Sequence, residues 1–306
     1  MNKLYVFGHT KPDTDSIASA IVFAKLQKAL GIDAVAYKLG EVNKETKYAL
    51  KTFEVEEPQT LTSVDENCDV ALVDNNEFSQ SVSGIEKAHV KMVVDHHKIK
   101  LETVEPIYFI TEPLGCTCTI LYKLYKQNEV DIDSQTAGLM LSAIISDTLL
   151  FKSPTCTEQD KEIAKKLAKI AGIDLESYGK EMLKAGTDIS DFTPFQVINI
   201  DSKEFNDKNA KFEISQVNAV DLDSVFSRQS ELEDAINKEI KEKNLDFYMF
   251  AATDILNANS KIIAIGNKAD TVEKAFGVNL ENNTAMLNNV VSRKKQMLPN
   301  ILNNLD

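Results

Sequence analysis

The sequence predicts an α/β fold in which a doubly wound, mainly parallel sheet is followed by a second, smaller mixed α/β domain. Short apolar runs alternate with segments of helical periodicity through the first part of the chain, a pattern typical of strands and crossover helices in a parallel sheet. A turn-rich stretch then interrupts this alternation. We therefore predict a first domain at residues 1–187, a linker at residues 188–194 and a second domain at residues 195–306.

In the first domain, an apolar run at residues 3–8 predicts the first strand. Residues 16–30 carry apolar side chains at helical spacing, and Gly31 is the expected C-cap. Gly172 ends the last predicted helix in the same way. Further strands are predicted at residues 34–37, 70–73, 91–94 and 107–110, and further helices from about Asn43 and at residues 115–127, 134–146 and 157–171.

In the second domain, strand-like runs surround one charged amphipathic helix, predicted at residues 229–243. This mixture indicates a small α/β domain. Its predicted strands lie at residues 196–200, 211–217, 247–252 and 261–265.

Composition excludes several classes of protein. With 306 residues, 43% of them hydrophobic and 26% charged, the chain is typical of a soluble globular protein. No apolar run approaches the roughly 18–20 residues of a membrane helix, and the apolar part of the N-terminus is too short for a signal peptide. We therefore expect a cytoplasmic protein that does not bind membranes.

The net charge of -13 argues against nucleic-acid binding, which needs a basic surface. It still allows a small anionic substrate if cations, such as metal ions, are concentrated locally. The cysteines include one close pair, Cys116 and Cys118, without the second half of a zinc site. We expect buried, reduced thiols there.

Acidic and histidine side chains follow three of the predicted strands. The carboxyl ends of parallel strands meet at one edge of a sheet, so these side chains should converge on one crevice. Imidazoles mixed with carboxylates form sites for divalent transition metals. The number of these side chains in the sequence suggests two ions rather than one. The side chains are His9, Asp13 and Asp15 after the first strand, Asp74 after the strand at 70–73, and Asp95, His96 and His97 after the strand at 91–94.

Each of these groups also has a structural alternative. Asp15 or Ser16 could simply cap the free amides at the start of the next helix, and an Asp at a strand end, such as Asp74, is more often a turn residue. Adjacent histidines at 96 and 97 are harder to explain without a metal or a phosphate. Asp147 opposes the dipole of an apolar helix, which either a cation or plain exposure would explain.

A basic run, Arg293-Lys294-Lys295, stands near the end of this acidic chain. Three adjacent cations usually form a solvated face, but an Arg beside a Lys also suits a phosphate-rich substrate. Only the pairing with a metal cluster favours the second interpretation. The sequence contains no Walker A motif, dinucleotide glycine fingerprint, HExxH or GxSxG segment.

Taken together, these segments resemble the DHH phosphoesterase superfamily, and within it the manganese-dependent family II inorganic pyrophosphatases. The resemblance covers essentially the whole chain. The first four motifs are shared across DHH enzymes, whereas the last is much more specific to the pyrophosphatases. The motifs are GHTKPDTDS at 8–16, VDNNE at 73–77, VDHH at 94–97, SDT at 146–148 and SRKKQ at 292–296.

The resemblance implies a DHH metal-binding catalytic domain, a DHHA2-like substrate-binding domain and a homodimer. It implies two Mn²⁺ ions per subunit, with Co²⁺ as an alternative and Mg²⁺ arriving with the substrate. The implied metal ligands are His9, Asp13, Asp15, Asp74, His96 and Asp147, with Asp74 and Asp147 bridging or straddling the ions. The implied substrate-binding residues are Lys203, Arg293, Lys294 and His97, which with Asp74 form the catalytic set.

Two residues behind these ligands also follow from the resemblance. Asp95 is expected to orient a histidine ligand. Asn75 stands where the family commonly has a histidine beside a metal ligand, which bears on metal affinity and preference.

The implied reaction is hydrolysis of pyrophosphate to two phosphates, which makes the protein a diphosphate phosphohydrolase. We expect a two-metal mechanism with a metal-bridging hydroxide as nucleophile and an active site between the domains. Lys203, Arg293 and Lys294 would stabilise phosphoryl charge, and His97 would protonate the leaving phosphate.

Three rival functions remain open at this stage. A DHH phosphoesterase acting on short oligonucleotides would usually carry a GGGH-type segment in its second domain, which is absent from this sequence. An exopolyphosphatase that trims short polyphosphate chains is closer to the implied activity and harder to exclude. A metal-dependent phosphate or nucleotide sensor would lack a catalytic element.

Overall fold

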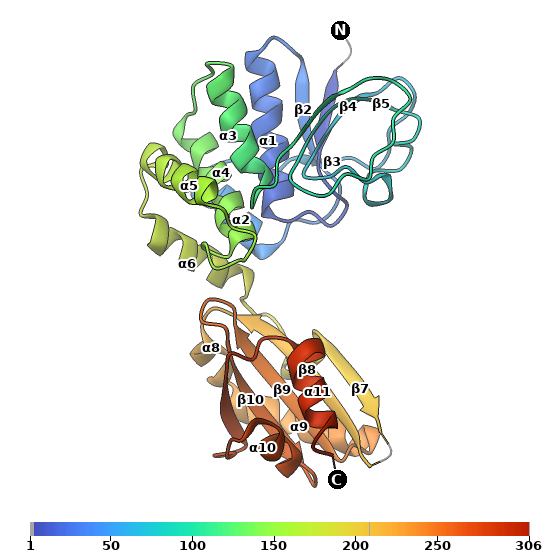
Figure 1. Cartoon of the computed structure of the whole chain (residues 1–306), viewed down its shortest axis with the longest axis vertical. Coiled ribbons are helices and arrows are strands. Elements are labelled where there is room, and N and C mark those ends of the chain that lie inside the picture. Colours follow the sequence, from blue (N-terminus) through green and yellow to red (C-terminus); the bar gives the residue numbers. More distant parts are fainter. Residues whose placement is uncertain (1–2, 208, 306) are drawn as a thin grey trace. The chain divides into compact units, whose positions relative to one another are not determined.

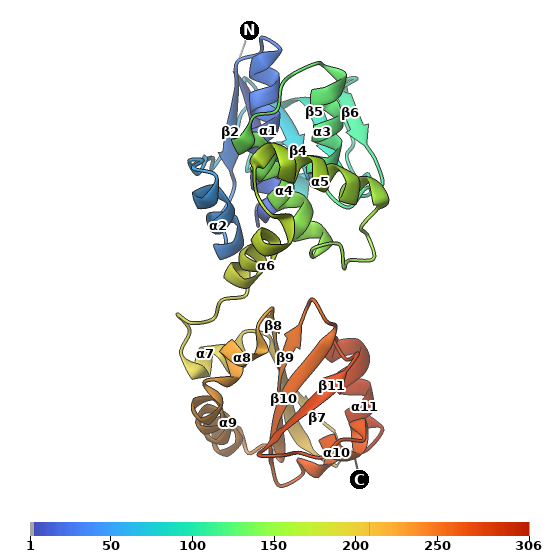
Figure 2. The same cartoon turned by 90° about the vertical axis from the view of Figure 1, so that its left-hand side faces the viewer.

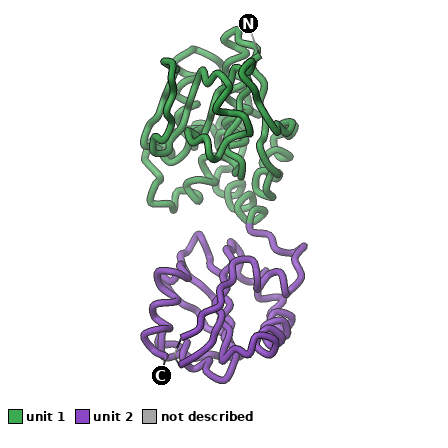
Figure 3. Tube along the Cα trace, turned by 90° about the vertical axis from the view of Figure 1, so that its right-hand side faces the viewer, with its two compact units in different colours: residues 1–186 green, residues 187–306 purple. Residues whose placement is uncertain are grey.

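The computed structural model describes residues 3–207 and 209–305. The chain divides into two compact units, Met1–Gly186 and Thr187–Asp306 (Figure 3), and each is described by itself. Within the described residues, none of the helices is both long and apolar enough to cross a membrane.

The first unit is built on a six-stranded sheet in the order β3-β2-β1-β4-β5-β6, in which every neighbouring pair is parallel. The order reverses between β1 and β4, and in such sheets ligands bind outside the carboxyl ends of the strands at this switch point. The predicted parallel α/β sheet is confirmed. The strands are β1 (Leu4–Phe7), β2 (Ala34–Lys38), β3 (Gln59–Thr60), β4 (Asp69–Val73), β5 (His89–Asp95) and β6 (Tyr108–Thr111).

The register brings the predicted site loops to one edge. Phe7 of β1 lies opposite Leu72 of β4, and Val73 of β4 lies opposite Val94 of β5. His9 therefore leaves β1 at the level where Asp74 leaves β4 and where His96 follows β5. Convergence of these loops is a consequence of parallel pairing rather than of any local motif.

Helices of the first unit gather on one face of the sheet (Figure 1). Asp13, rather than Asp15 or Ser16, caps α1, and Asn43 caps α2. Gly172 is the C-cap of α5 as expected, whereas Gly31 adopts positive φ one residue after Leu30, the C-cap of α1. The helices are α1 (Thr14–Ala29), α2 (Lys44–Thr52), α3 (Thr117–Gln127), α4 (Ser134–Thr148), α5 (Glu158–Ala171) and α6 (Leu175–Gly186), with a short 3₁₀ turn η1 (Phe78–Gln80).

The other face of this sheet is covered by non-helical segments. Phe7, Leu72 and Val93 from the strands pack with Val64 and Ile85 from the loops before β4 and β5. All five are almost completely buried, and burial of apolar surface on this scale stabilises the packing of these loops on the sheet.

The second unit is a five-stranded mixed sheet in the order β11-β10-β9-β8-β7, in which only β8 and β9 run parallel. The central strand β9 is buried on both faces along its whole length. This is the smaller mixed α/β domain that the sequence predicts. Its strands are β7 (Ser202–Asn206), β8 (Lys211–Ala219), β9 (Phe247–Asp254), β10 (Asn259–Gly266) and β11 (Thr284–Asn288).

Helices pack on both faces of the second sheet, with α7, α8 and α9 on one side and α10 and α11 on the other (Figure 2). Ile198 and Ile236 are buried on the first face, and Val272 and Ile301 on the second. The helices are α7 (Pro194–Asn199), α8 (Leu222–Phe226), α9 (Gln229–Lys243), α10 (Asp270–Phe276) and α11 (Leu298–Leu302), with a π-helical turn η2 (Arg293–Met297).

One prediction of secondary structure is wrong. Residues 196–200 were expected to form a strand but lie in and just after helix α7, which begins with Pro194 at its first turn. Thr193 and Gln196 form a reciprocal capping box, so the local start signal outweighs the apolar content of the segment. Helices α6, α8, α10 and α11 and strands β3, β7 and β11 were not predicted.

Candidate metal centre and active site

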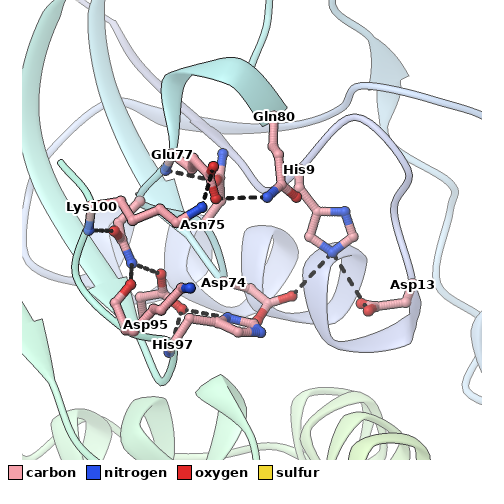
Figure 4. A pocket seen from close by; sticks show the side chains of 11 residues that line it. His9, Asp13, Asp74, Asn75, Glu77, Gln80, Asp95, His97 and Lys100 are labelled. Carbon is pink, nitrogen blue, oxygen red and sulfur yellow. Dashed lines mark hydrogen bonds and ion pairs between the residues drawn. The ribbon is translucent and has the colours of Figure 1, made fainter.

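His9, Asp13 and Asp74 form the first cluster of potential metal ligands (Figure 4). Nε2 of His9 lies 3.5 Å from Oδ2 of Asp13 and 3.5 Å from Oδ2 of Asp74. The other oxygen of Asp13 accepts a hydrogen bond from the backbone N–H of Ser16, at 2.9 Å. Asp13 therefore both caps α1 and presents a carboxylate oxygen to His9, so the two interpretations of this loop are compatible.

Asp74 is at the centre of the site. It directly follows β4 with a left-handed φ of 51°, a conformation that Asp adopts more easily than most residues. Its side chain is 2% exposed. Oδ1 accepts a hydrogen bond from Thr117 Oγ1 at 3.2 Å and lies 3.5 Å from Nε2 of His96. The strand end thus projects a buried carboxylate among imidazoles from two different loops.

Asp15, His96 and Asp147 form a second cluster, whose ligand atoms lie within 4.8 Å of one another. Nδ1 of His96 bonds to the carbonyl oxygen of Leu114 at 2.9 Å, which directs Nε2 toward Asp74 and toward Asp147, 3.8 Å away. Asp13 and Asp15 therefore belong to different clusters.

Asp15 is in the first turn of α1 and is fully buried. Its carboxylate lies against the N-terminus of helix α3. Its carboxylate accepts hydrogen bonds from the backbone N–H groups of Thr117, at 2.6 Å, and Cys118, at 3.2 Å. An anion at a helix N-terminus is favoured by the free amides and the helix dipole. No pattern in the sequence indicates this contact, which joins residues about one hundred positions apart. Cys116 and Cys118 are free and buried, as expected.

The histidine that Asp95 orients is His97, which is a correction to the expected role. Oδ1 of Asp95 accepts from the backbone N–H of His97 at 3.0 Å and lies 2.9 Å from its Nδ1. The resemblance assigns His97 to the substrate, whereas the predicted metal ligand His96 is oriented by Leu114. Asn76, which was not predicted, donates to the other oxygen of the completely buried Asp95.

Asn75 is buried and points its side-chain oxygen at the backbone N–H of Glu77, 2.9 Å away. Its Nδ2 is buried without a hydrogen-bond partner. A pocket of about 300 Å³ opens beside it. The lining of this pocket includes His9, Asp13, Asp74, Asn75 and His97, together with the unpredicted cations Lys98 and Lys100.

The electrostatics of the cluster show how strongly these groups depend on one another. Burial works to lower the pKa of His9, but the carboxylates of Asp13 and Asp74 outweigh it and raise that pKa to about 10. The same balance, with Asp74 and Asp15, raises the pKa of His96 to about 9. Burial and neighbouring carboxylates raise the pKa of Asp15 to about 6 and that of Asp147 well above its usual range.

These shifts predict that the metal-free protein loses stability as the pH rises. Asp15 and Asp147 hold protons in the folded state that the unfolded chain releases near pH 4. Stability therefore falls as the pH rises above about 4, through about 6 for Asp15 and further for Asp147. His9 and His96 hold protons that the unfolded chain releases near pH 6.5, so stability falls further through about 9 and 10. The contribution of Asp74 has the opposite sign, because its lowered pKa gives stability that is lost only as the pH falls below about 4.

The check is urea unfolding of the metal-free protein at pH 5, 7 and 9, with and without Mn²⁺. In the transition that Mn²⁺ shifts, we expect the midpoint without metal to fall with pH. With Mn²⁺ the trend should reverse, because ligands bind metal in their deprotonated forms. A metal-free midpoint that rises from pH 5 to pH 9 would contradict the assignment.

The remaining predicted residues, Lys203, Arg293 and Lys294, belong to the second unit. Lys203 lies on β7 opposite Ile214 of β8. The guanidinium of Arg293 donates to the carbonyl oxygens of Ile214 and Asp201 and lies 2.7 Å from Oδ1 of Asp201. Lys203 and Arg293 therefore meet the same part of β8.

The π-helical turn fixes the basic run. Gln296 Oε1 accepts from the backbone N–H groups of Val291 and Ser292, at 2.9 and 3.1 Å, and Ser292 Oγ accepts from that of Lys295. Gln216 Oε1 accepts from the backbone N–H of Arg293 at 3.0 Å. The polar residues that flank the basic run thus hold the backbone in a rare conformation that often occurs at functional sites.

Comparison with known proteins defines the class. The model of the DHH family, N-terminal domain, matches residues 3–144, and that of the DHHA2 domain matches residues 180–304. The fold also resembles that of an exopolyphosphatase-related protein from Bacteroides fragilis, with a TM-score of 0.50 and 14% identity over 99% of this chain and 91% of that one. The chain is therefore a two-domain DHH–DHHA2 protein.

More similar proteins define the family. A manganese-dependent inorganic pyrophosphatase of Bacillus subtilis (strain 168) is 55% identical over 301 residues, which cover 98% of this chain and 97% of the relative. A Methanococcus jannaschii protein assigned to the family II inorganic pyrophosphatases matches with a TM-score of 0.64 and 40% identity over 99% of each chain. The chain belongs to the manganese-dependent family II inorganic pyrophosphatases.

Proposed function

We propose that this chain hydrolyses inorganic pyrophosphate to two phosphates with two bound Mn²⁺ ions. The observation that carries the proposal is the pair of carboxylate–imidazole clusters at the switch point of the first sheet, in a chain 55% identical to a manganese-dependent inorganic pyrophosphatase. The basic run Arg293-Lys294-Lys295 of the second unit supplies cations that are complementary to a polyanion.

The residues of the clusters fit divalent transition metals. Asp15, Asp74 and Asp147 bring three carboxylates together with two imidazoles, and burial together with the neighbouring carboxylates raises the pKa of Asp15 and Asp147. Such a set is unfavourable without a cation and matches the oxygen and nitrogen ligands that Mn²⁺ takes. We propose that His9, Asp13 and Asp74 hold one ion, and that Asp15, His96 and Asp147 hold the other with Asp74 shared.

When bound, two such ions would activate a water as the nucleophile and neutralise charge on the phosphoryl oxygens. Co²⁺ suits the same donors, and we propose that Mg²⁺ accompanies the substrate. The chain's own contribution is to fix the ligands through the Leu114 carbonyl and the amides that begin α3.

We propose that His97 supplies the proton for the leaving phosphate. The hydrogen bond to Asp95 raises the pKa of His97, which favours the protonated ring that a general acid needs. With Nδ1 facing Asp95, Nε2 is the ring atom left for a phosphate oxygen. Lys203, Arg293 and Lys294 of the second unit would bind the phosphates and stabilise charge as it shifts to the leaving group. This role requires the two units to meet over the substrate.

The test is phosphate release from pyrophosphate by metal-stripped protein, with Mg²⁺ alone and with Mn²⁺ or Co²⁺ added. Tripolyphosphate and a short oligonucleotide are assayed in parallel. We expect Mn²⁺-activated cleavage confined to pyrophosphate. Turnover of the oligonucleotide with little pyrophosphate cleavage would instead place the chain among other DHH phosphoesterases, and preference for tripolyphosphate would indicate a short-chain exopolyphosphatase.

From its family we also propose that the chain forms a homodimer and does not bind nucleic acid. Sedimentation velocity with and without Mn²⁺ tests the first point. A monomer at micromolar concentration under both conditions would contradict it.

A further inference from the structure

Glu45 lies outside both metal clusters but connects the segments that carry them. It is in the first turn of α2, behind the Asn43 cap. Its Oε1 accepts hydrogen bonds from Thr14 Oγ1, at 2.7 Å, and from Ser146 Oγ. Thr14 Oγ1 also lies 3.0 Å from Thr46 Oγ1, so two neighbouring residues of α2 hold the same hydroxyl.

Both hydroxyls belong to residues next to proposed metal ligands. Thr14 stands between Asp13 and Asp15 at the start of α1, and Ser146 directly precedes Asp147 at the end of α4. One carboxylate oxygen therefore fixes two helix ends that are 132 residues apart (146 − 14) and that supply ligands to both clusters.

Packing alone does not account for an acid at this position. Burial raises the pKa of Glu45, and the charge of Asp13 acts in the same direction. Bringing another carboxylate toward this acidic cluster is therefore unfavourable for the metal-free fold. An ionised carboxylate oxygen can, however, accept from two hydroxyls at once without donating to either.

The position of Glu45 is also restricted from its other side. A Cβ atom added to Gly186, the last residue of α6, would lie 2.9 Å from Cβ of Glu45 and 3.0 Å from its Oε2. Contacts that short essentially do not occur, so the backbone of α6 closes directly over this side chain. Glu45 is therefore held between α6 and the two hydroxyls.

We propose that Glu45 is a positioning residue of the two-metal site, fixing Thr14 and Ser146 so that Asp13, Asp15 and Asp147 present their carboxylates at the spacing that two divalent cations require. The inference rests on the proposed metal site. It predicts that Mn²⁺ affinity depends on the acceptor oxygen of Glu45 even though Glu45 does not contact the ions.

The experiment is Mn²⁺ binding to the metal-stripped protein, followed by the electron paramagnetic resonance signal of free Mn²⁺. Glu45→Ala is expected to weaken binding by about 10- to 100-fold, the range for residues that orient metal ligands. Glu45→Gln keeps one acceptor oxygen and should recover most of this loss. Lys47→Ala, an exposed change on the same helix, is the matched control and should bind as wild type.

Thr14→Val and Ser146→Ala test the same contacts from the other side. Each should weaken Mn²⁺ binding in the wild type but add little to Glu45→Ala, because all three remove one interaction. These two variants decide the question if Glu45→Ala does not fold. Wild-type Mn²⁺ affinity with only a lowered melting temperature, in Glu45→Ala or in both hydroxyl variants, would overturn the proposal. Failure of the proposed function looks different, because the wild type itself would then bind no Mn²⁺ tightly.

Discussion

Replacement of Asp74 by asparagine is expected to reduce pyrophosphate hydrolysis by more than about 100-fold and to remove tight binding of at least one Mn²⁺. Loss of a residue that only orients a ligand costs 10- to 100-fold, and we propose that Asp74 contacts the ions directly. Its two oxygens face His9 of the first cluster on one side and His96 of the second cluster on the other, so it lies between the two clusters. Asparagine keeps the volume but removes the charge.

The backbone makes this substitution a clean test. Asp74 has a φ of 51°, and asparagine tolerates the left-handed conformation as well as aspartate does. The fold should therefore survive the change. The matched control is Asp69→Asn at the opposite end of the same strand, which should leave hydrolysis and Mn²⁺ binding unchanged. Full Mn²⁺ stoichiometry in Asp74→Asn, measured by the resonance titration, would remove Asp74 from the ligand set.

The part of the site that could be predicted is the part that depends on the parallel sheet. His9, Asp74 and His96 are far apart in sequence, yet each follows a strand, and parallel register alone brings them to one edge. Metal chemistry could be predicted from residue types because carboxylates and imidazoles at one place have few other uses. Neither argument needs the exact element boundaries, which are less predictable.

The contacts that fix the ligands could not be predicted in this way. Asp15 bonds the amides of Thr117 and Cys118, and Glu45 bonds Ser146, through pairings of distant helices that leave no pattern in the sequence. The partner of Asp95 was misassigned for a related reason. In Asp95-His96-His97 either imidazole could have bonded Asp95. Nδ1 of His96 bonds the carbonyl oxygen of Leu114 instead, and Nδ1 of His97 faces Asp95.

Helix α7 illustrates a different limit. Its short apolar run suggests a strand, but Thr193 and Gln196 form a capping box, with Pro194 in the first turn, and these signals begin a helix. Val197 and Ile198 are then both buried against the second sheet, which adjacent residues of a strand with one buried face would not be. In a segment of this length, a capping box is a better indicator of secondary structure than the apolar content of the residues that follow it.

Replacement of Lys294 by alanine is expected to lower kcat/KM for pyrophosphate by about 10²- to 10³-fold, the usual cost of removing one group that stabilises charge in the transition state. The π-helical turn holds Lys294 next to Arg293, whose guanidinium is fixed against Asp201 and β8. A cation presented on a fixed backbone needs little ordering when the polyanion binds. Mn²⁺ binding should not change, because the clusters belong to the first unit.

Lys295 provides the control for this prediction, because it is the next residue of the same turn, equally exposed and equally charged. If the basic run acts only as a diffuse positive surface, Lys294→Ala and Lys295→Ala will lower kcat/KM equally, each by less than about fivefold, the effect of one solvent-exposed charge. If Lys294 contacts the substrate, only Lys294→Ala will show the large loss, and rising salt will not reproduce it. Full activity in Lys294→Ala would mean that the second unit does not contribute this lysine to the reaction, and the proposed role of the basic run would be wrong.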